Sequence, residues 1–292
     1  MTDARTITQS LGGKWYGRYG AAPCPICQPE RRKGQNGLTL ADGAKGLLLH
    51  CKKGGCTYRD ILAAAGIAPG SFTAPHPLLI AQREAERRAE ADKRAGQALR
   101  LWQDAQPISG TIAETYLRGR GITCDLPDTL RYHPECWHAS AKHFPALVAM
   151  VEGCERFAAH RTYLRADGSG KAPVEPAKAM LGAVMGGAVR LAASQGSVVV
   201  AEGIETALSL ASGLLRAPAT IWAALSTSGI RGLHLPPKPG RLTIAADGDT
   251  AGRGAAHALA TRAHALGWHV SLLPAPDCRD WNDILQGKAV AA

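Results

Sequence analysis

The strongest constraint on the fold is an alternation of short apolar runs and helical patterns between residues 196 and 275. The apolar runs have the β-branched composition of buried strands, and they are VVVAE (198–202), TIWAAL (220–225), LTIAAD (242–247) and HVSLLPA (269–275). ETALSLASGLL (205–215) and AGRGAAHALATRAHALG (251–267) between them have helical spacing. This alternation predicts an α/β fold in which helices cover both faces of a parallel sheet.

Acidic residues follow two of these strands. Glu202 ends the first run, Asp247 ends the third, and Asp249 follows two residues later. Because parallel strands end at one edge of a sheet, the three carboxylates should share a crevice. An acid after a strand commonly caps a helix, but their recurrence favours a site for Mg²⁺ or Mn²⁺. RDWND (279–283) should bring Asp280 and Asp283 towards the same edge.

Two cysteine pairs near the amino terminus predict a zinc site. Cys24 and Cys27 enclose two residues, and after 23 more residues Cys51 and Cys56 enclose four. Paired thiolates on two turns can converge on one tetrahedral Zn²⁺, in a segment too small for a large core of its own. His50 is adjacent, and we interpret it as a flanking residue rather than a ligand.

Composition favours a phosphate-rich partner. The formal net charge is +10, and residues 1–75 hold ten Lys or Arg against four Asp or Glu. Such a balance is typical of nucleic-acid-binding modules. The sequence has neither an 18-residue apolar stretch nor the apolar run of a signal peptide, so we expect a cytoplasmic protein with no membrane partner.

Three segments resemble the successive motifs of the Toprim family, which is shared by bacterial primases, topoisomerases and some nucleases. They are EGIETAL (202–208), ADGDTAG (246–252) and RDWNDIL (279–285). The resemblance implies that Glu202, Asp247 and Asp249 are catalytic and hold Mg²⁺ or Mn²⁺ together with Asp280. Many members have an aspartate four residues after the first glutamate, whereas here Thr206 occupies that place and Glu205 precedes it.

The resemblance extends to the Toprim proteins of phages, plasmids and other mobile elements. These have a cysteine-rich finger, a helix similar to IAETYLRGRGI (112–122) and a segment similar to HRTYLRADGSGKAPVEPAKAMLG (160–182). In bacterial primases a comparable segment lines the nucleotide and template groove. By this similarity, Arg161, Arg165, Lys171 and Lys178 are expected to bind nucleic acid or nucleotide.

Together these observations predict four parts. Residues 1–70 are a zinc-ribbon-like module, 71–106 a linker and charged helix, 107–193 an α+β pre-Toprim segment, and 194–292 a Rossmann-like Toprim catalytic domain. We expect Leu99 and Trp102 to dock the far end of the charged helix.

The function that this organisation predicts is that of a DNA primase, which makes short primers on single-stranded DNA by metal-dependent nucleotidyl transfer. Nucleoside triphosphates are its substrates, one structural Zn²⁺ and catalytic Mg²⁺ or Mn²⁺ its cofactors, and a separate helicase or replication initiator its expected partner. Trp15 or Tyr16 could stack on bases, but we favour core packing for both. The alternatives are a Toprim nuclease, in which the same metals activate water, and a non-catalytic replication accessory protein.

Overall fold

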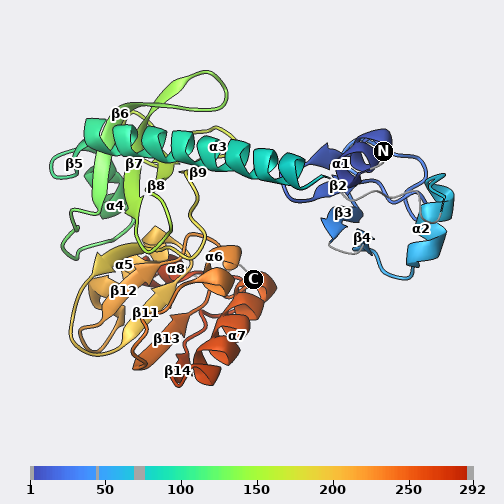
Figure 1. Cartoon of the computed structure of the whole chain (residues 1–292). Coiled ribbons are helices and arrows are strands. Elements are labelled where there is room, and N and C mark those ends of the chain that lie inside the picture. The colour runs from blue at the N-terminus through green and yellow to red at the C-terminus, as the bar shows by residue number, and fades with distance from the viewer. Residues whose placement is uncertain (1–2, 44–45, 69–75, 288–292) are drawn as a thin grey trace. The chain divides into compact units, whose positions relative to one another are not determined.

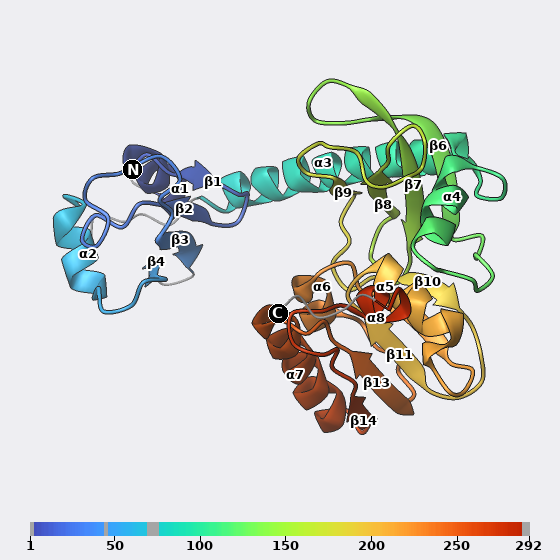
Figure 2. The ribbon, with the colours of Figure 1, turned by 180° about the vertical axis from the view of Figure 1, so that it is seen from behind.

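The computed structural model describes residues 3–43, 46–68 and 76–287. The chain divides into two compact units, Met1–Glu90 and Ala91–Ala292, which Figures 1 and 2 show from opposite sides. No helix in the described ranges has the length and apolar character needed to cross a membrane.

The first unit is built on an antiparallel sheet in the order β1-β2-β3-β4. Its elements are α1 (Ala4–Ser10), β1 (Lys14–Trp15), β2 (Gly20–Ala22), β3 (Leu38–Gly43), β4 (Gly46–Cys51) and α2 (Tyr58–Ala64). Ile7, Leu38, Leu40 and Ile61 form a small core with Cys24 and Cys51. The cysteines therefore lie beside the only apolar cluster that this unit has within the described residues.

The charged helix α3 (Pro77–Asp104) runs from the first unit into the second. Within the first unit, Arg83 forms ion pairs with Asp3 at 2.6 Å and with Asp42 at 3.5 Å. In the second unit Trp102 is buried, and the guanidinium of Arg131 lies 4.4 Å from its ring. The prediction for Leu99 was wrong: its side chain is 40% exposed, and the neighbouring Ala98 takes the buried position.

The second unit contains two five-stranded sheets. The first is antiparallel, in the order β5-β6-β7-β8-β9. Its elements are β5 (Gln106–Pro107), α4 (Ile112–Gly119), β6 (Leu130–Trp137), β7 (His143–Val151), β8 (Ala158–Tyr163) and β9 (Lys178–Leu181).

The other sheet has the order β10-β12-β11-β13-β14. Its elements are β10 (Val189–Ala192), β11 (Val198–Ala201), α5 (Ile204–Ser209), the π-helical turn η1 (Leu210–Leu214), β12 (Thr220–Ala223), α6 (Thr227–Gly232), β13 (Arg241–Ala245), α7 (Thr250–Ala265), β14 (His269–Leu272) and α8 (Trp281–Leu285). β12, β11, β13 and β14 are parallel to their neighbours in this run, as predicted. β10 adds an antiparallel edge strand that the sequence analysis did not anticipate.

Alternate residues of the central strands face opposite sides of this sheet. Val199 and Ala201 pack with α5 and α8 on one side, whereas Val200 and Ile244 pack with α6 and α7 on the other. Helices therefore cover both faces (Figure 2), as the alternation of strands and helices predicts.

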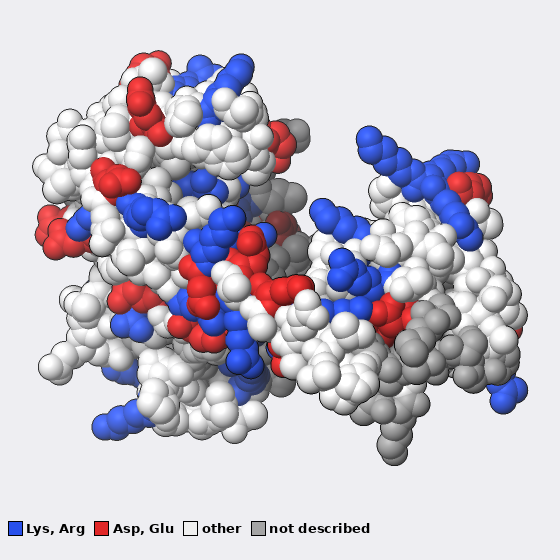
Figure 3. Space-filling model, turned by 45° about the horizontal axis from the view of Figure 1, so that its top comes forward, with Lys and Arg blue, Asp and Glu red and all other residues white. Residues whose placement is uncertain are grey.

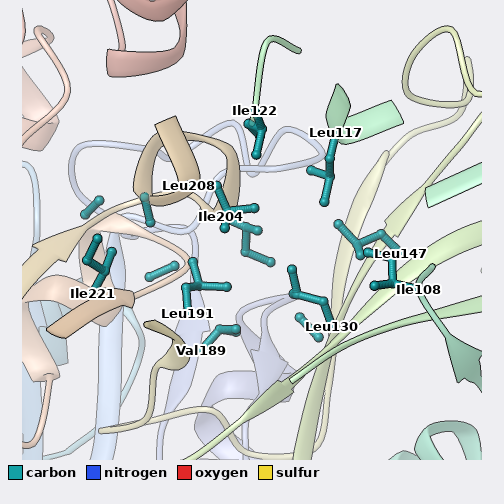
Figure 4. Close-up of a cluster of buried hydrophobic side chains, with 14 of the residues drawn as sticks. Ile108, Leu117, Ile122, Leu130, Leu147, Val189, Leu191, Ile204, Leu208 and Ile221 are labelled. Atoms are coloured by element: carbon teal, nitrogen blue, oxygen red, sulfur yellow. The ribbon is translucent and has the colours of Figure 1, made fainter. Parts of the chain in front are cut away.

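A shared apolar cluster joins the two sheets of the second unit. Leu117, Leu130 and Leu147 from the antiparallel part meet Ile204 and Leu208 of α5 (Figure 4). Each such buried side chain contributes roughly 1.5–3 kcal/mol of transfer free energy. The antiparallel sheet and α5 are thereby held in a fixed relation.

The helix predicted at 205–215 is shorter than expected. α5 ends at Ser209, and η1 follows, with Gly213 at φ 110°. The hydroxyls of Ser209 and Ser212 donate to the carbonyls of Glu205 and Leu208, at 2.7 and 2.8 Å. Such back-bonding competes with the helical ladder.

Candidate active site and metal centre

The two predicted cysteine pairs come together in the first unit. The Sγ atoms of Cys24, Cys27, Cys51 and Cys56 all lie within 4.8 Å of one another. Cys27 Sγ and Cys51 Sγ are 3.6 Å apart, too far for a disulfide of about 2.05 Å but close to the ~3.8 Å that a tetrahedron with Zn–S bonds of about 2.3 Å requires. The group therefore fits Zn²⁺, and it does not include the exposed His50.

Local turns bring these thiols together. Gly54 and Gly55 have φ of 78° and 81°, so the chain curls tightly between Cys51 and Cys56. The side-chain oxygen of Gln28 accepts hydrogen bonds from the N–H groups of Cys24 and Gly37, at 3.2 and 2.8 Å. This bridge braces the first turn against the residue before β3.

The thiols resist simultaneous ionisation in the absence of a cation. Burial opposes ionisation of Cys24, yet the backbone N–H groups of Cys27 and Ile26 outweigh it and lower its pKa. Burial and the neighbouring thiols raise the pKa of Cys27, and they raise that of Cys56 to about 12. A bound metal ion removes this conflict, because it favours thiolates over thiols.

The predicted acids lie at one edge of the mixed sheet in the second unit. β11 and β13 are adjacent and parallel, with Ala201 opposite Ala245, so Glu202 and Asp247 follow neighbouring strand ends. Asp249 caps α7 by accepting a hydrogen bond from Gly252 N–H at 2.6 Å. Asp280 caps α8 and accepts from Asp283 N–H at 2.8 Å.

A glycine brings the last two motifs together. Gly248 N–H donates to the carbonyl of Arg279 at 2.8 Å, and Cys278 N–H donates back to the Gly248 carbonyl at 3.2 Å. A Cβ at position 248 would collide with the carbonyl oxygen of Pro276. Only glycine permits this approach, which sets Asp247 and Asp249 beside Asp280.

Asp247 is the acid whose surroundings most clearly call for a cation. Its Oδ1 is buried without a hydrogen-bond partner. Burial, followed by the charges of Glu202, Asp280 and Asp249, raises the pKa of Asp247 to about 7. Burial and Asp249 also raise the pKa of Glu202. An unpaired buried oxygen among carboxylates suits a hard divalent ion such as Mg²⁺ or Mn²⁺.

The carboxylates are less tightly gathered than the thiols. Within the described ranges, the cysteine cluster is the only group of three or more His, Cys, Asp or Glu whose ligand atoms converge closely enough to hold a metal ion. One carboxylate oxygen of Asp249 and one of Asp280 accept backbone hydrogen bonds at the starts of α7 and α8. The acids therefore fit a cation that keeps water or phosphate oxygens in its shell, as Mg²⁺ commonly does.

Two of the four predicted basic residues form ion pairs with another acid of this domain, Glu205. Lys171 Nζ is 3.3 Å from Oε1 of Glu205, and Lys178 Nζ is 3.0 Å from Oε2. The charge of Lys178 partly opposes the rise in the pKa values of Asp247 and Glu202 that burial and the neighbouring acids cause. Lys178 therefore links the antiparallel sheet to the acidic edge of the mixed sheet.

The other two basic residues are placed differently. Arg161 is buried and donates to the carbonyl of Trp137 at 3.2 Å. Arg165 is exposed and lines a cavity of about 600 Å³ with His143, Phe144 and Asp167. On the face shown in Figure 3, basic side chains are interspersed with acidic ones. The nucleic-acid-binding role of both arginines stays a prediction.

Sequence reasoning missed the partners of Glu205. This carboxylate is buried, and besides the two lysines it accepts a hydrogen bond from the hydroxyl of Tyr116 at 2.8 Å. Thr206, at the place where many Toprim proteins have an aspartate, is also buried. The only hint in the sequence was that the charged Glu205 precedes Thr206, where the family pattern has an aspartate. The partners of Glu205 lie far away in the sequence.

The comparisons with known proteins identify the two parts of the second unit. Residues 197–290 match the family described as Toprim domain, and residues 92–191 match a domain of unknown function, DUF7146. No curated protein matches the chain.

Solved primase structures are similar in outline, at low identity. A DNA primase domain from Pseudomonas aeruginosa is 17% identical, with a TM-score of 0.41 over 67% of this chain and 75% of that one. The zinc-binding and RNA polymerase domains of Aquifex aeolicus primase are 15% identical, with a TM-score of 0.40 over 97% and 79%. The RNA polymerase domain of Mycobacterium tuberculosis primase DnaG is 17% identical, with a TM-score of 0.38 over 69% and 80%.

The motifs EGIETAL, ADGDTAG and RDWNDIL all fall within the matched range 197–290. The resemblance from which the Toprim assignment was made is therefore confirmed, and this chain carries a Toprim domain, preceded by a DUF7146 domain.

Proposed function

We propose that this protein is a DNA primase that makes short oligonucleotide primers on single-stranded DNA by metal-dependent nucleotidyl transfer. The observation that carries the proposal is the unpaired buried oxygen of Asp247, which lies in a Toprim domain and whose pKa is raised by burial and by the acids around it. The four-cysteine cluster and the pre-Toprim lysines add to it, because both accompany a Toprim domain in the primases that the sequence resembles.

The reaction would require positioning rather than a protein nucleophile. The 3′-hydroxyl of one nucleotide attacks the α-phosphate of the next, the new P–O bond forms as the α–β bond breaks, and pyrophosphate leaves while the hydroxyl proton passes to water. A divalent ion held by Glu202, Asp247, Asp249 and Asp280 would supply charge neutralisation at the phosphates. Lys171 and Lys178 would hold the outgoing phosphates, and the exposed Arg165 would contact the template strand, whereas the buried Arg161 would support the sheet behind it.

The first unit would hold the template. Tyr16 and Tyr19 are exposed, and their rings stack with centroids 5.4 Å apart. Lys14 Nζ lies 5.6 Å from the ring of Tyr16. Exposed rings beside a cation suit single-stranded nucleic acid. Trp15 is half-buried and packs against the core, as favoured, but the core reading was wrong for Tyr16, which is therefore the residue available for stacking.

The test is incorporation of labelled ribonucleotides on unprimed single-stranded DNA with Mg²⁺ or Mn²⁺, with template cleavage scored in parallel. The wild type should make short products, Asp247→Asn should make none, and Asp128→Asn, which changes an exposed acid on the loop before β6, should behave as the wild type. Metal-dependent cleavage without synthesis would instead identify a Toprim nuclease. If the chain shows neither synthesis nor cleavage but still binds single-stranded DNA, that result would favour an accessory protein.

A further inference from the structure

Glu205 is the most completely enclosed acid in the second unit. Its side chain is 6% exposed, whereas those of Lys171 and Lys178 are 35% and 38% exposed. Lys171 and Tyr116 occupy Oε1, and Lys178 occupies Oε2. Burial opposes ionisation of Glu205, but Lys178 and Lys171 outweigh it and hold its pKa well below the usual range. The carboxylate is therefore a buried, fully satisfied anion.

The two lysine side chains differ from that of Glu205 in being partly exposed. Each has three N–H donors, and Glu205 is the partner of one donor on each, which leaves donors directed elsewhere. One carboxylate cannot neutralise two ammonium groups. The buried His160 adds no charge at neutral pH, because burial and then Lys178 lower its pKa to about 4. The cluster of Glu205, Lys171 and Lys178 thus keeps a net positive charge.

Three separate parts of the chain meet in this cluster. Lys178 begins β9, Lys171 follows the hairpin after β8, and Glu205 lies in the first turn of α5. Glu202 directly follows β11, three residues before Glu205. The excess positive charge therefore lies next to the acids that suit a divalent cation.

We propose that Glu205 is a positioning residue, which holds the ammonium groups of Lys171 and Lys178 as a paired receptor for the polyphosphate of an incoming nucleotide. The inference deepens the proposed function and rests on it for the identity of the nucleotide. Two cations held at fixed points on one carboxylate lose less side-chain entropy on binding phosphate than two free lysines would. The proposal also gives a role to the acid that precedes Thr206: Glu205 holds two lysine ammonium groups and does not bind metal.

Binding of inorganic tripolyphosphate, measured by calorimetry on the full-length chain with Mg²⁺, tests this role without requiring catalysis. Glu205→Gln should weaken binding roughly tenfold, because the amide cannot balance either ammonium group. Glu114→Gln is the matched control, since it breaks the exposed α4 pair with Arg118 and should leave affinity unchanged. Unchanged affinity in Glu205→Gln would overturn the inference.

A double-mutant comparison separates positioning from general damage. In the Lys171→Gln/Lys178→Gln background, Glu205→Gln should cause no further loss of affinity; a further full loss would show that Glu205 does not act through the lysines. In primer synthesis, Glu205→Gln should raise KM for nucleotide more than it lowers kcat. Should Glu205→Gln not fold, Lys171→Gln and Lys178→Gln alone carry the test, and wild-type affinity in both would overturn it.

These results are distinguishable from failure of the primase proposal. Tripolyphosphate binding that depends on Glu205, in a chain that makes no primers, would support the receptor and refute the primase. Primer synthesis by Glu205→Gln with unaltered tripolyphosphate affinity and unaltered KM for nucleotide would support the primase and refute the receptor.

Discussion

The N–H of Gly248 donates to the carbonyl oxygen of Arg279 at 2.8 Å, and this bond ties the loop after β13 to the loop before α8. Each loop carries acids of the candidate cation site, Asp247 and Asp249 on one and Asp280 on the other. These backbone contacts, together with the ion pair between Arg253 of α7 and Asp277, hold the two loops side by side. The glycine between the two aspartates is thus as much a part of the site as the acids themselves.

Gly248→Ala should abolish most activity with a smaller effect on folding. The added methyl group meets the carbonyl of Pro276 and forces the two loops apart. We expect primer synthesis to fall roughly a hundredfold, as misplacement by about 1 Å can do. Gly119→Ala is the control, because a Cβ at the end of α4 meets nothing within 4 Å. Equal activities of the two variants would contradict the bracing role.

Asp247 should destabilise the metal-free fold at alkaline pH. Its folded pKa of about 7 lies above the ordinary 3.8, so its contribution is most favourable at low pH and is lost as the pH rises through 7. Asp247→Asn should therefore increase the free energy of unfolding at pH 8 by roughly 1–2 kcal/mol after solvent screening, which corresponds to a rise in Tm of a few degrees. Thermal unfolding without added Mg²⁺ or Mn²⁺ measures this. A gain that persists undiminished at pH 4 would contradict the assigned cause.

Cys24→Ser should release the zinc ion and loosen the first unit. The small core beside the thiols cannot compensate for a lost metal. Atomic absorption on the purified chain should find about one zinc per chain in the wild type and almost none in the variant. Cys124→Ser, outside the cluster, should retain it. Full zinc occupancy in Cys24→Ser would refute this ligand set.

Tyr16→Ala should weaken binding of single-stranded DNA. Removing one ring of the exposed Tyr16–Tyr19 pair eliminates a stacking surface worth roughly 1–3 kcal/mol per base. Fluorescence anisotropy with a labelled oligonucleotide gives the affinity. Tyr58→Ala is matched in exposure, 47% against 50% for Tyr16, and should bind as the wild type. An equal loss in both would point to non-specific damage.

The elements that the sequence predicted best are those specified by local patterns. Apolar runs locate β11 and β13, and the turn-borne cysteine pairs converge because two short spacings and two glycines suffice. The long helix α3 spans Pro77–Asp104 because its charges and helix formers agree throughout.

Features set by distant contacts were not predictable. β10 has four residues, too few for periodicity to reveal that it runs antiparallel to β12. Glu205 meets Lys171 and Lys178 across 34 and 27 positions, and nothing near Glu205 specifies that pairing. Ala98 is buried in place of the predicted Leu99, because the face that α3 buries depends on where Trp102 packs.

The most direct test of the account is the binding of Mn²⁺ to the carboxylates of the Toprim domain, followed by electron paramagnetic resonance on the full-length chain at pH 7.5. The wild type and Asp128→Asn should both bind Mn²⁺, and Asp247→Asn should lose that binding, because the unpaired buried oxygen is replaced by a group that ligates poorly. Mn²⁺ binding in Asp247→Asn equal to that of the wild type would contradict the assignment of the Toprim acids as the cation site.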